Sequence, residues 1–384
     1  MKLIVDVNHG ALELAKHYLF LGYDVAIYDI YNKLEKSKEH RIIFENLKEK
    51  FGVELINNPE FSSFDEVIAP IHCPLTISFT SFHDAVSFII KKRFKDKSKR
   101  IICITGVKGK TTTTEILYSL LKDDYEIALH NSNRGSIAPP AILDLLEREE
   151  KDLYIFECSL GLVESKYGAI TNILENYPIA KGKRRAIVKF LTTKNCETCY
   201  VNKEDLVKYN IKVKENFKVL DTEVKILKKY PLRFLYMNEE IELNESCLGL
   251  HYIKNSIFAL EIAKNYMDIK DAIKKLKNIK IKNRMEVKGK VVRNINPGLD
   301  VKAIEYSIRD YLSIFDGPIY IGGNFGVTCE EIDIKKLSEV LKKFKAKYVF
   351  VGEIGKELLK YIDGEYLEEI DEVEEGLIII RHSL

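Results

Sequence analysis

The sequence predicts an α/β protein of three domains, in which mostly parallel sheets are covered by helices. The chain has 384 residues, too many for one hydrophobic core of ordinary size. Hydrophobic residues make up 46% and charged residues 31%, a balance that excludes disordered and collagen-like chains. Short β-branched runs also alternate with helical patterns along the whole chain, as parallel sheets require. We expect the domains to be residues 1–98, 99–288 and 289–384.

The charges are almost balanced. Lys and Arg number 60 against 58 Asp and Glu, a formal net charge of +2. A protein that coats nucleic acid or a polybasic membrane binder would have a larger excess of basic over acidic residues. Any anion site in this chain must therefore be a local cluster. No run reaches the roughly 18 apolar residues of a membrane span, and the N-terminus lacks the features of a signal peptide. We therefore expect a cytoplasmic protein with neither a nucleic-acid nor a membrane partner.

The seven cysteines are scattered and odd in number, which does not suggest a disulfide framework. Cys196 and Cys199 form the one close pair, and no second pair stands at zinc-finger spacing. We favour buried thiols over a metal or redox role for this pair, and the role of Cys329 stays open.

The first domain begins with a pattern of strand, turn, helix and strand. The strands are expected at 2–7 and 24–28, the helix at 10–22, and Asp29 ends the unit. This resembles half of a Rossmann fold, but the turn lacks the Gly-x-Gly-x-x-Gly fingerprint of dinucleotide sites. A Rossmann-like substrate-binding domain is the better interpretation. The basic stretch at 91–100 then predicts a linker or a solvated helix end.

The most informative segment is a glycine turn between a strand at 101–105 and a helix. It reads Gly106-Val107-Lys108-Gly109-Lys110-Thr111-Thr112. Two glycines let backbone N–H groups turn toward a phosphate, and the helix start directs its positive end at the same anion. Lys110 could reach between the β- and γ-phosphates, and the Thr111 hydroxyl could bind Mg²⁺. The usual loop has another glycine where Ile104 stands, yet the lysine and paired threonines argue against a chance turn.

The remaining pattern extends the α/β alternation to the C-terminus. An acidic run at 365–375 predicts a solvated face or loop. Further strands are expected at 153–156, 169–173, 318–321 and 348–351, and helices at 110–121, 138–146, 251–266, 301–314 and 334–344.

The short phosphate loop resembles that of the Mur ligase family, ATP-dependent enzymes that include the folylpolyglutamate synthetases. The resemblance covers nearly the whole chain and implies a central P-loop ATPase domain between a Rossmann-like N-terminal substrate domain and a Rossmann-like C-terminal domain. It also implies ATP and Mg²⁺ as cofactors. The family's strand-end glutamate matches Glu157, which together with Thr111 would bind the metal.

Later motifs of the family can be matched in the same order. The glycine-histidine helix start with a following asparagine corresponds to 249–255, and this places Asn255 near the adenine. The Arg-Met-Glu motif places Arg284 near the phosphates, and Asn294 stands where the family has its ribose-binding aspartate. A helix-start histidine and a surface ion pair are the alternatives for His251 and Arg284. The resemblance thus assigns catalysis to Lys110, Glu157 and Arg284, and nucleotide binding to Gly106, Val107, Lys108, Gly109, Lys110, Thr111, Thr112, Asn255, Arg284 and Asn294.

The chain departs from the family where a second metal is usually bound. Asn176 and Tyr177 stand in place of the Asp-His pair, and the nearest candidate for the CO₂-modified lysine is Lys189, at a short spacing. The segment 181–185 carries four cations, which suit a polycarboxylate, although a solvated basic helix end is the alternative.

In these departures the chain resembles one branch of the family. Segments 6–10, 176–178 and 322–330 and the short C-terminal domain support the same resemblance. That branch acts on a nickel tetrapyrrole of methanogens. It implies that ATP activates a propionate of a nickel seco-tetrapyrrole polycarboxylate as an acyl phosphate, and that a ring carbon then closes a carbocycle. An amide-forming ligase that extends a cell-wall or folate precursor is the second hypothesis, and a nucleotide-binding protein without catalysis is the third.

Overall fold

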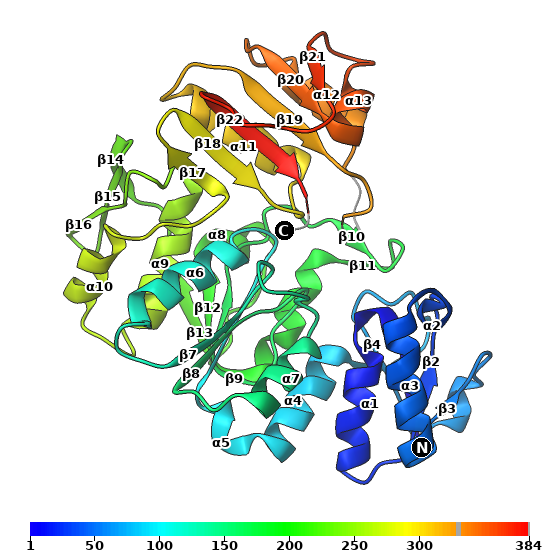
Figure 1. The fold of residues 1–384 in the computed structure, drawn as a ribbon. Helices are drawn as coiled ribbons and strands as arrows, with labels where there is room; N and C mark the ends of the chain where they lie inside the picture. The colour runs from blue at the N-terminus through cyan, green and yellow to red at the C-terminus, as the bar shows by residue number, and fades with distance from the viewer. Residues whose placement is uncertain (328–331, 383–384) are drawn as a thin grey trace. The chain divides into compact units, whose positions relative to one another are not determined.

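The structure is a computed structural model that describes residues 1–327 and 332–382. The chain forms two compact units, Met1–Thr222 and Glu223–Leu384, and each is described by itself. Figure 1 shows the order of their helices and strands.

The first unit begins with a five-stranded parallel sheet in the order β3-β2-β1-β4-β5. The first three strands have the order of a Rossmann half, and β4 and β5 extend the sheet in the Rossmann order, so the predicted Rossmann-like fold of this segment is confirmed. The first strand ends earlier than expected because Asp6, with φ 85°, leaves the β region. The strands are β1 (Lys2–Val5), β2 (Val25–Tyr28), β3 (Glu54–Leu55), β4 (Glu66–Ala69) and β5 (Thr80–Ser81), and the helices are α1 (Ala11–Phe20), α2 (Lys33–Lys36), α3 (Lys38–Phe51), α4 (Phe82–Arg93) and α5 (Lys95–Ser98).

The basic stretch at 91–100 is not a linker. It holds the end of α4 and all of α5, with Phe94 buried between them. Lys97 Nζ donates to the carbonyls of Leu146 and Glu149, each at 2.6 Å. The alternative, a solvated helix end, is confirmed, since Lys91 and Lys92 are exposed in the last turn of α4. The expectation of a linker failed because a run of cations conceals the single apolar anchor, Phe94.

A six-stranded parallel sheet follows, in the order β13-β12-β9-β6-β8-β7. The helix predicted at 110–121 has those bounds, whereas the next begins only at Ala141 because Pro139 and Pro140 precede it. The strands are β6 (Ile101–Thr105), β7 (Ile127–His130), β8 (Leu153–Glu157), β9 (Ser165–Ile170), β12 (Cys196–Asn202) and β13 (Phe217–Leu220), with helices α6 (Lys110–Leu121), α7 (Ala141–Arg148) and α8 (Lys203–Lys208), a 3-10 segment at Ala186–Asn195, and a hairpin of β10 (Pro178–Ile179) and β11 (Arg184–Arg185).

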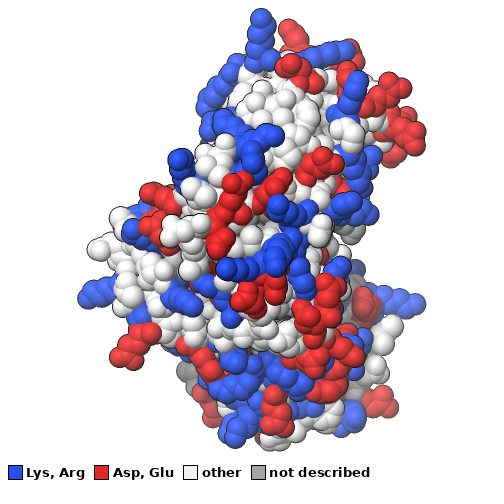
Figure 2. All heavy atoms as spheres, turned by 90° about the vertical axis from the view of Figure 1, so that its left-hand side faces the viewer, with Lys and Arg blue, Asp and Glu red and all other residues white. Residues whose placement is uncertain are grey.

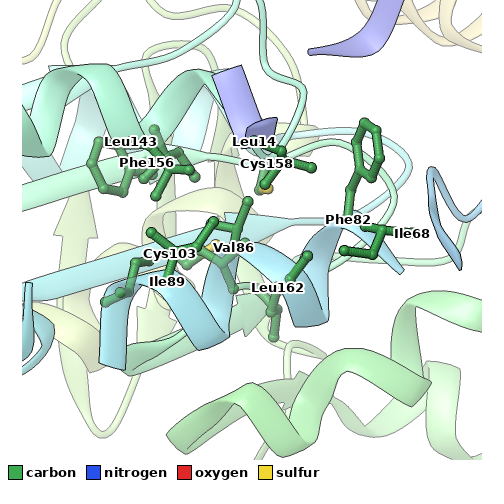
Figure 3. Packing of buried hydrophobic residues seen from close by; sticks show 14 of the residues in the cluster. Leu14, Ile68, Phe82, Val86, Ile89, Cys103, Leu143, Phe156, Cys158 and Leu162 are labelled. Carbon is green, nitrogen blue, oxygen red and sulfur yellow. The ribbon is translucent and has the colours of Figure 1, made fainter. Parts of the chain in front are cut away.

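The two sheets of the first unit share one hydrophobic core. Figure 3 shows α4 packed against this core through Phe82, Val86 and Ile89. Facing them are side chains of the central sheet and its connections, Cys103, Leu143, Phe156, Cys158 and Leu162. Cys196 and Cys199 are buried free thiols, as expected, whereas Cys329 lies outside the described residues.

The second unit begins with an antiparallel sheet that the sequence did not predict. Its strands are β14 (Lys225–Lys229), β15 (Leu232–Tyr236) and β16 (Glu239–Glu242). All five residues of β14 are exposed, so it carries no apolar pattern to reveal it. The helices α9 (His251–Ala263) and α10 (Ile269–Leu276) follow.

The last sheet has the order β17-β18-β22-β19-β20-β21, antiparallel between β17 and β18 and parallel elsewhere. It begins at Arg284, and the acidic run at 365–375 opens with an exposed edge strand. The strands are β17 (Arg284–Lys288), β18 (Val291–Ile295), β19 (Ile319–Gly323), β20 (Tyr348–Val351), β21 (Glu365–Leu367) and β22 (Gly376–Arg381), and the helices are α11 (Val301–Leu312), α12 (Ile334–Leu341) and α13 (Gly352–Leu358).

Charges of both signs are interspersed on the face shown in Figure 2, in keeping with the balanced composition. Among the described residues, no helix combines the length and the apolar character that crossing a membrane would need.

We expect the stability of the first unit to depend on the neutral form of His83. This α4 side chain is buried, and its Nε2 lies 2.8 Å from the carbonyl oxygen of Ser159 in the central domain. Burial lowers the pKa of His83 from 6.5 to about 4. Between these values the unfolded chain binds a proton that the folded chain excludes, so the free energy of unfolding falls as the pH drops through this window. The total loss is about 3 kcal/mol.

Urea unfolding at a series of pH values measures this effect. His83→Gln keeps a nitrogen donor near the position of Nε2 but cannot titrate, so it should weaken the pH dependence. An unchanged slope in this variant would show that His83 does not contribute.

Candidate active site

The phosphate loop is held in place by the end of β9. The N–H of Val107 donates to the Asn172 carbonyl at 2.9 Å, and the Thr171 hydroxyl donates to the Lys108 carbonyl at 2.6 Å. Gly106 has a φ of +145°, and a Cβ there would lie 2.1 Å from Thr171 Oγ1. The loop therefore requires glycine at this position, both for its backbone and for its packing.

Three predicted site residues converge beyond the loop. Thr111 Oγ1 lies 2.8 Å from Glu157 Oε2, and Lys110 Nζ lies 3.8 Å from Glu157 Oε1. Glu157 ends β8 and Lys110 begins α6, so the two meet at the carboxyl edge of the sheet, where α/β proteins commonly bind ligands. The glutamate is only 2% exposed.

The donor set of this cluster fits a magnesium ion. A hydroxyl and a carboxylate are hard oxygen ligands of the kind that Mg²⁺ prefers. A buried carboxylate is costly without a cation, and in this structure Glu157 is compensated by Lys110 and by neutral donors. The arrangement can hold a metal ion against a phosphate in the loop.

Sequence reasoning missed Ser132. Its N–H donates to Glu157 Oε2 at 3.0 Å, and its hydroxyl lies 2.8 Å from Thr111 Oγ1. The neighbouring Asn131 and Arg134 both bind Glu115 on α6, which fixes the segment. The only signal was a polar run after the apolar strand β7, at the same edge as Glu157.

The positions that depart from the family support the β10–β11 hairpin. Asn176 Oδ1 accepts the N–H of Ile187 at 2.9 Å, and the Asn176 carbonyl accepts from Arg185 Nη1 at 3.0 Å. Lys189 is 1% exposed, and its Nζ lies 5.5 Å from the ring centroid of Tyr177.

The four cations at 181–185 divide into two pairs. Arg184 donates to the carbonyls of Ile71 and Cys73, and Lys183 donates to that of Pro74, so both bind the N-terminal domain. The side chains of Lys181, Lys183 and Arg185 are exposed, and Arg185 also donates to the Asn176 carbonyl. Lys181 has a φ of 53°, a left-handed conformation that is costly for a residue with a Cβ and concentrates at functional sites.

Asn255, Arg284 and Asn294 belong to the second unit. Arg284 is 9% exposed and donates to the Ile295 carbonyl at 3.0 Å, so it is not a surface ion pair. Asn294 is bonded to Ser307 and Asn296, and Asn255 is buried in α9. His251 begins α9, and its side chain is exposed.

The second unit also has a cavity of about 730 Å³ at the carboxyl ends of β18, β19, β20 and β22. Gly323 lies at its wall with a φ of +114°, and a Cβ there would lie 2.2 Å from the Arg381 carbonyl oxygen. Charged side chains line the cavity, including Arg293, Glu353, Lys356, Glu368, Glu369 and Asp371.

Solved structures similar to this chain include Mur ligases. A pseudomurein peptide ligase type C from Methanothermus fervidus matches 100% of this chain and 97% of its own, with a TM-score of 0.53 and 15% identity. A MurF ligase from Thermotoga maritima, solved in complex with ADP, matches 93% of this chain and 90% of its own, with a TM-score of 0.58 and 16% identity. The fold of this chain is that of the Mur ligases.

Relatives found by sequence identify the particular family within this fold. The coenzyme F430 synthetase of Methanocaldococcus jannaschii is 52% identical over 100% of this chain and 98% of its own. The enzyme of that name from Methanosarcina acetivorans is 25% identical over 91% of this chain and 89% of its own. A family model for the C-terminal domain of coenzyme F430 synthetase matches residues 283–382. The chain belongs to the coenzyme F430 synthetase family.

We expect Gly106→Ala to destabilise the first unit by about 3 kcal/mol, because backbone strain adds to the clash with Thr171. Gly182→Ala is the matched control, since Gly182 also has a positive φ, +84°, but a Cβ added there would meet nothing within 4 Å. It should cost only about 1 kcal/mol. Urea unfolding measures both, and equal losses would contradict the packing argument.

Proposed function

We propose that this protein completes coenzyme F430 by an ATP-dependent ring closure. A propionate carboxylate of a nickel seco-tetrapyrrole attacks the γ-phosphorus of ATP, which gives an acyl phosphate and releases ADP. A ring carbon then attacks the activated carbonyl and loses its proton as phosphate leaves, so a carbon–carbon bond closes the carbocycle. The full-length identity of 52% to a coenzyme F430 synthetase is the observation that carries this proposal.

Lys110, Thr111 and Glu157 would perform the phosphoryl transfer. The backbone N–H groups of the glycine loop bind the phosphates, and Lys110 neutralises charge between the β- and γ-groups. Thr111 and Glu157 would hold Mg²⁺, which neutralises phosphate charge when it is bound. Ser132 supports this arrangement, because its N–H and hydroxyl orient the Glu157 carboxylate and the Thr111 hydroxyl.

The second unit would contribute the remaining nucleotide contacts. We infer a phosphate contact for Arg284, an adenine contact for Asn255 and a ribose contact for Asn294. The bonds of Asn294 to Ser307 and Asn296 mean that a ribose would have to replace one of them or share its acceptor.

The exposed cations of the hairpin fit the substrate's carboxylates. Lys183 and Arg184 donate to backbone carbonyls of residues 71–74. Lys181 and the remaining N–H groups of Arg185, which also donates to the Asn176 carbonyl, would meet a polycarboxylate. Both hairpin strands belong to the first unit, as does the phosphate loop.

ADP release should depend on the tetrapyrrole. With ATP and Mg²⁺, we expect the purified protein to release ADP when the nickel seco-tetrapyrrole is added and not when amino acids are added. Release with amino acids alone would favour the amide-forming ligase instead.

Two variants test the phosphate site in the same assay. Lys110→Ala should lower turnover by at least about a thousandfold, because the phosphoryl group loses its main charge partner. Thr111→Val should raise the Mg²⁺ requirement at least about tenfold, whereas Thr111→Ser keeps the hydroxyl and should remain close to the wild type. Full turnover in Lys110→Ala would overturn the assignment of this loop.

Lys181→Ala and Arg185→Ala should each raise KM for the tetrapyrrole by about tenfold and leave KM for ATP unchanged, since each removes one charge-assisted contact. Lys181→Arg keeps the charge and should behave as wild type. Lys48→Ala, on the exposed face of α3, is the control. Equal changes in both KM values would show that the hairpin does not select the substrate.

A further inference from the structure

Two clusters in the described residues bring three potential metal ligands within 4.8 Å of one another. One is Glu13, His17 and Glu147, and the other is Asp6, His9 and His72. In the first, Glu147 already pairs with Lys16 and Arg93 at 2.6 and 3.0 Å. Its negative charge is neutralised, so that cluster is an ion-pair network.

The second cluster has a different charge environment. The Asp6 carboxylate is fully buried and pairs with two imidazoles, His9 Nδ1 at 2.7 Å and His72 Nε2 at 4.0 Å. Asp6 Oδ1 and His72 Nε2 are buried atoms without a hydrogen-bond partner in the structure. Such atoms are costly in a folded protein. A cation bound between Asp6 Oδ2 and the two imidazoles would satisfy His72 Nε2 and neutralise the buried carboxylate.

The backbone at Asp6 is also strained. Asp6 has φ 85° and ψ 84°, between the end of β1 and the short 3-10 turn at Val7–His9. A non-glycine residue in this region costs about 1–3 kcal/mol, and such strain concentrates where a side chain must be aimed. Here the strained conformation directs the carboxylate toward His9 and His72.

We propose that Asp6, His9 and His72 bind one divalent first-row transition-metal ion. Two imidazoles and a carboxylate are a known ligand set for such ions, and imidazole favours zinc, iron, nickel and copper over magnesium. Ligand atoms about 2.0–2.2 Å from a common ion lie about 3–3.6 Å apart. The observed separations of 2.7 and 4.0 Å bracket this range, so small side-chain rotations would complete the site.

The number of ligands distinguishes two sources of metal. A nickel ion inside a tetrapyrrole has its plane filled by ring nitrogens, so only one protein ligand reaches it from a given face. Three converging ligands instead suit a free ion that the protein itself holds. The imidazoles of His9 and His72 are 21% and 24% exposed, so the cluster lies close to the protein surface.

This site lies outside the phosphate cluster and needs neither ATP nor tetrapyrrole to be tested. Tag-free, metal-stripped full-length protein is titrated with Co²⁺, whose visible absorption reports its ligands. We expect one equivalent to bind with imidazole-type bands. His9→Ala, His72→Ala and Asp6→Asn should each weaken binding at least about tenfold.

Two controls keep the result interpretable. His40→Ala removes an imidazole on α3 that binds Ser37, and it should leave Co²⁺ binding unchanged. Circular dichroism of each variant must match the wild type, and Asp6→Asn retains the side-chain shape if either alanine variant unfolds. Absence of Co²⁺ binding in the wild type, or undiminished binding in folded Asp6→Asn and His72→Ala, would overturn the proposal. The proposal would also be overturned if the two histidines responded to the nickel tetrapyrrole but not to the free metal ion.

Discussion

The arrangement of the candidate nucleotide site depends on the contacts of one buried carboxylate, that of Glu157. It ends a central strand, accepts from Thr111 and the Ser132 N–H, and lies 3.8 Å from Lys110. These partners come from α6 and from the segment after β7, whereas Glu157 itself ends β8. A parallel sheet is what brings such distant segments to one edge, because all its strands end on the same side. The charge of Glu157 is tolerated at 2% exposure only because these donors surround it.

Sequence was sufficient where one local pattern determined one element. The phosphate loop and α6 follow from a strand, two glycines and a helix start, and the helix has the predicted bounds. Sequence was insufficient where structure depends on a partner far along the chain. Ser132 can be recognised as a site residue only once it is seen to donate to Glu157. The strand β14 exposes all its residues, so no alternation of buried and exposed positions predicts it. At 91–100 the predicted helix end is present, but the stretch is not a linker, because one buried phenylalanine anchors it among its many cations.

The residues that depart from the wider family have acquired structural partners in this chain. Asn176 holds Ile187 and Arg185, where other Mur ligases are expected to have a metal-binding pair. Nearby Lys189 is buried against Tyr177. The departures therefore coincide with a hairpin in which Lys181 has a left-handed backbone and three cations are exposed.

The shared core of the first unit means that its two sheets cannot be separated or exchanged independently. Helix α4 of the N-terminal sheet packs directly on side chains of the phosphate-loop sheet, and His83 reaches the Ser159 carbonyl across the same boundary. Neither sheet can open without exposing apolar surface of the other, so the two should unfold as one cooperative block. A chimera that takes its first ninety or so residues from a distant relative would thus inherit a mismatched interior, even where both parental folds are the same.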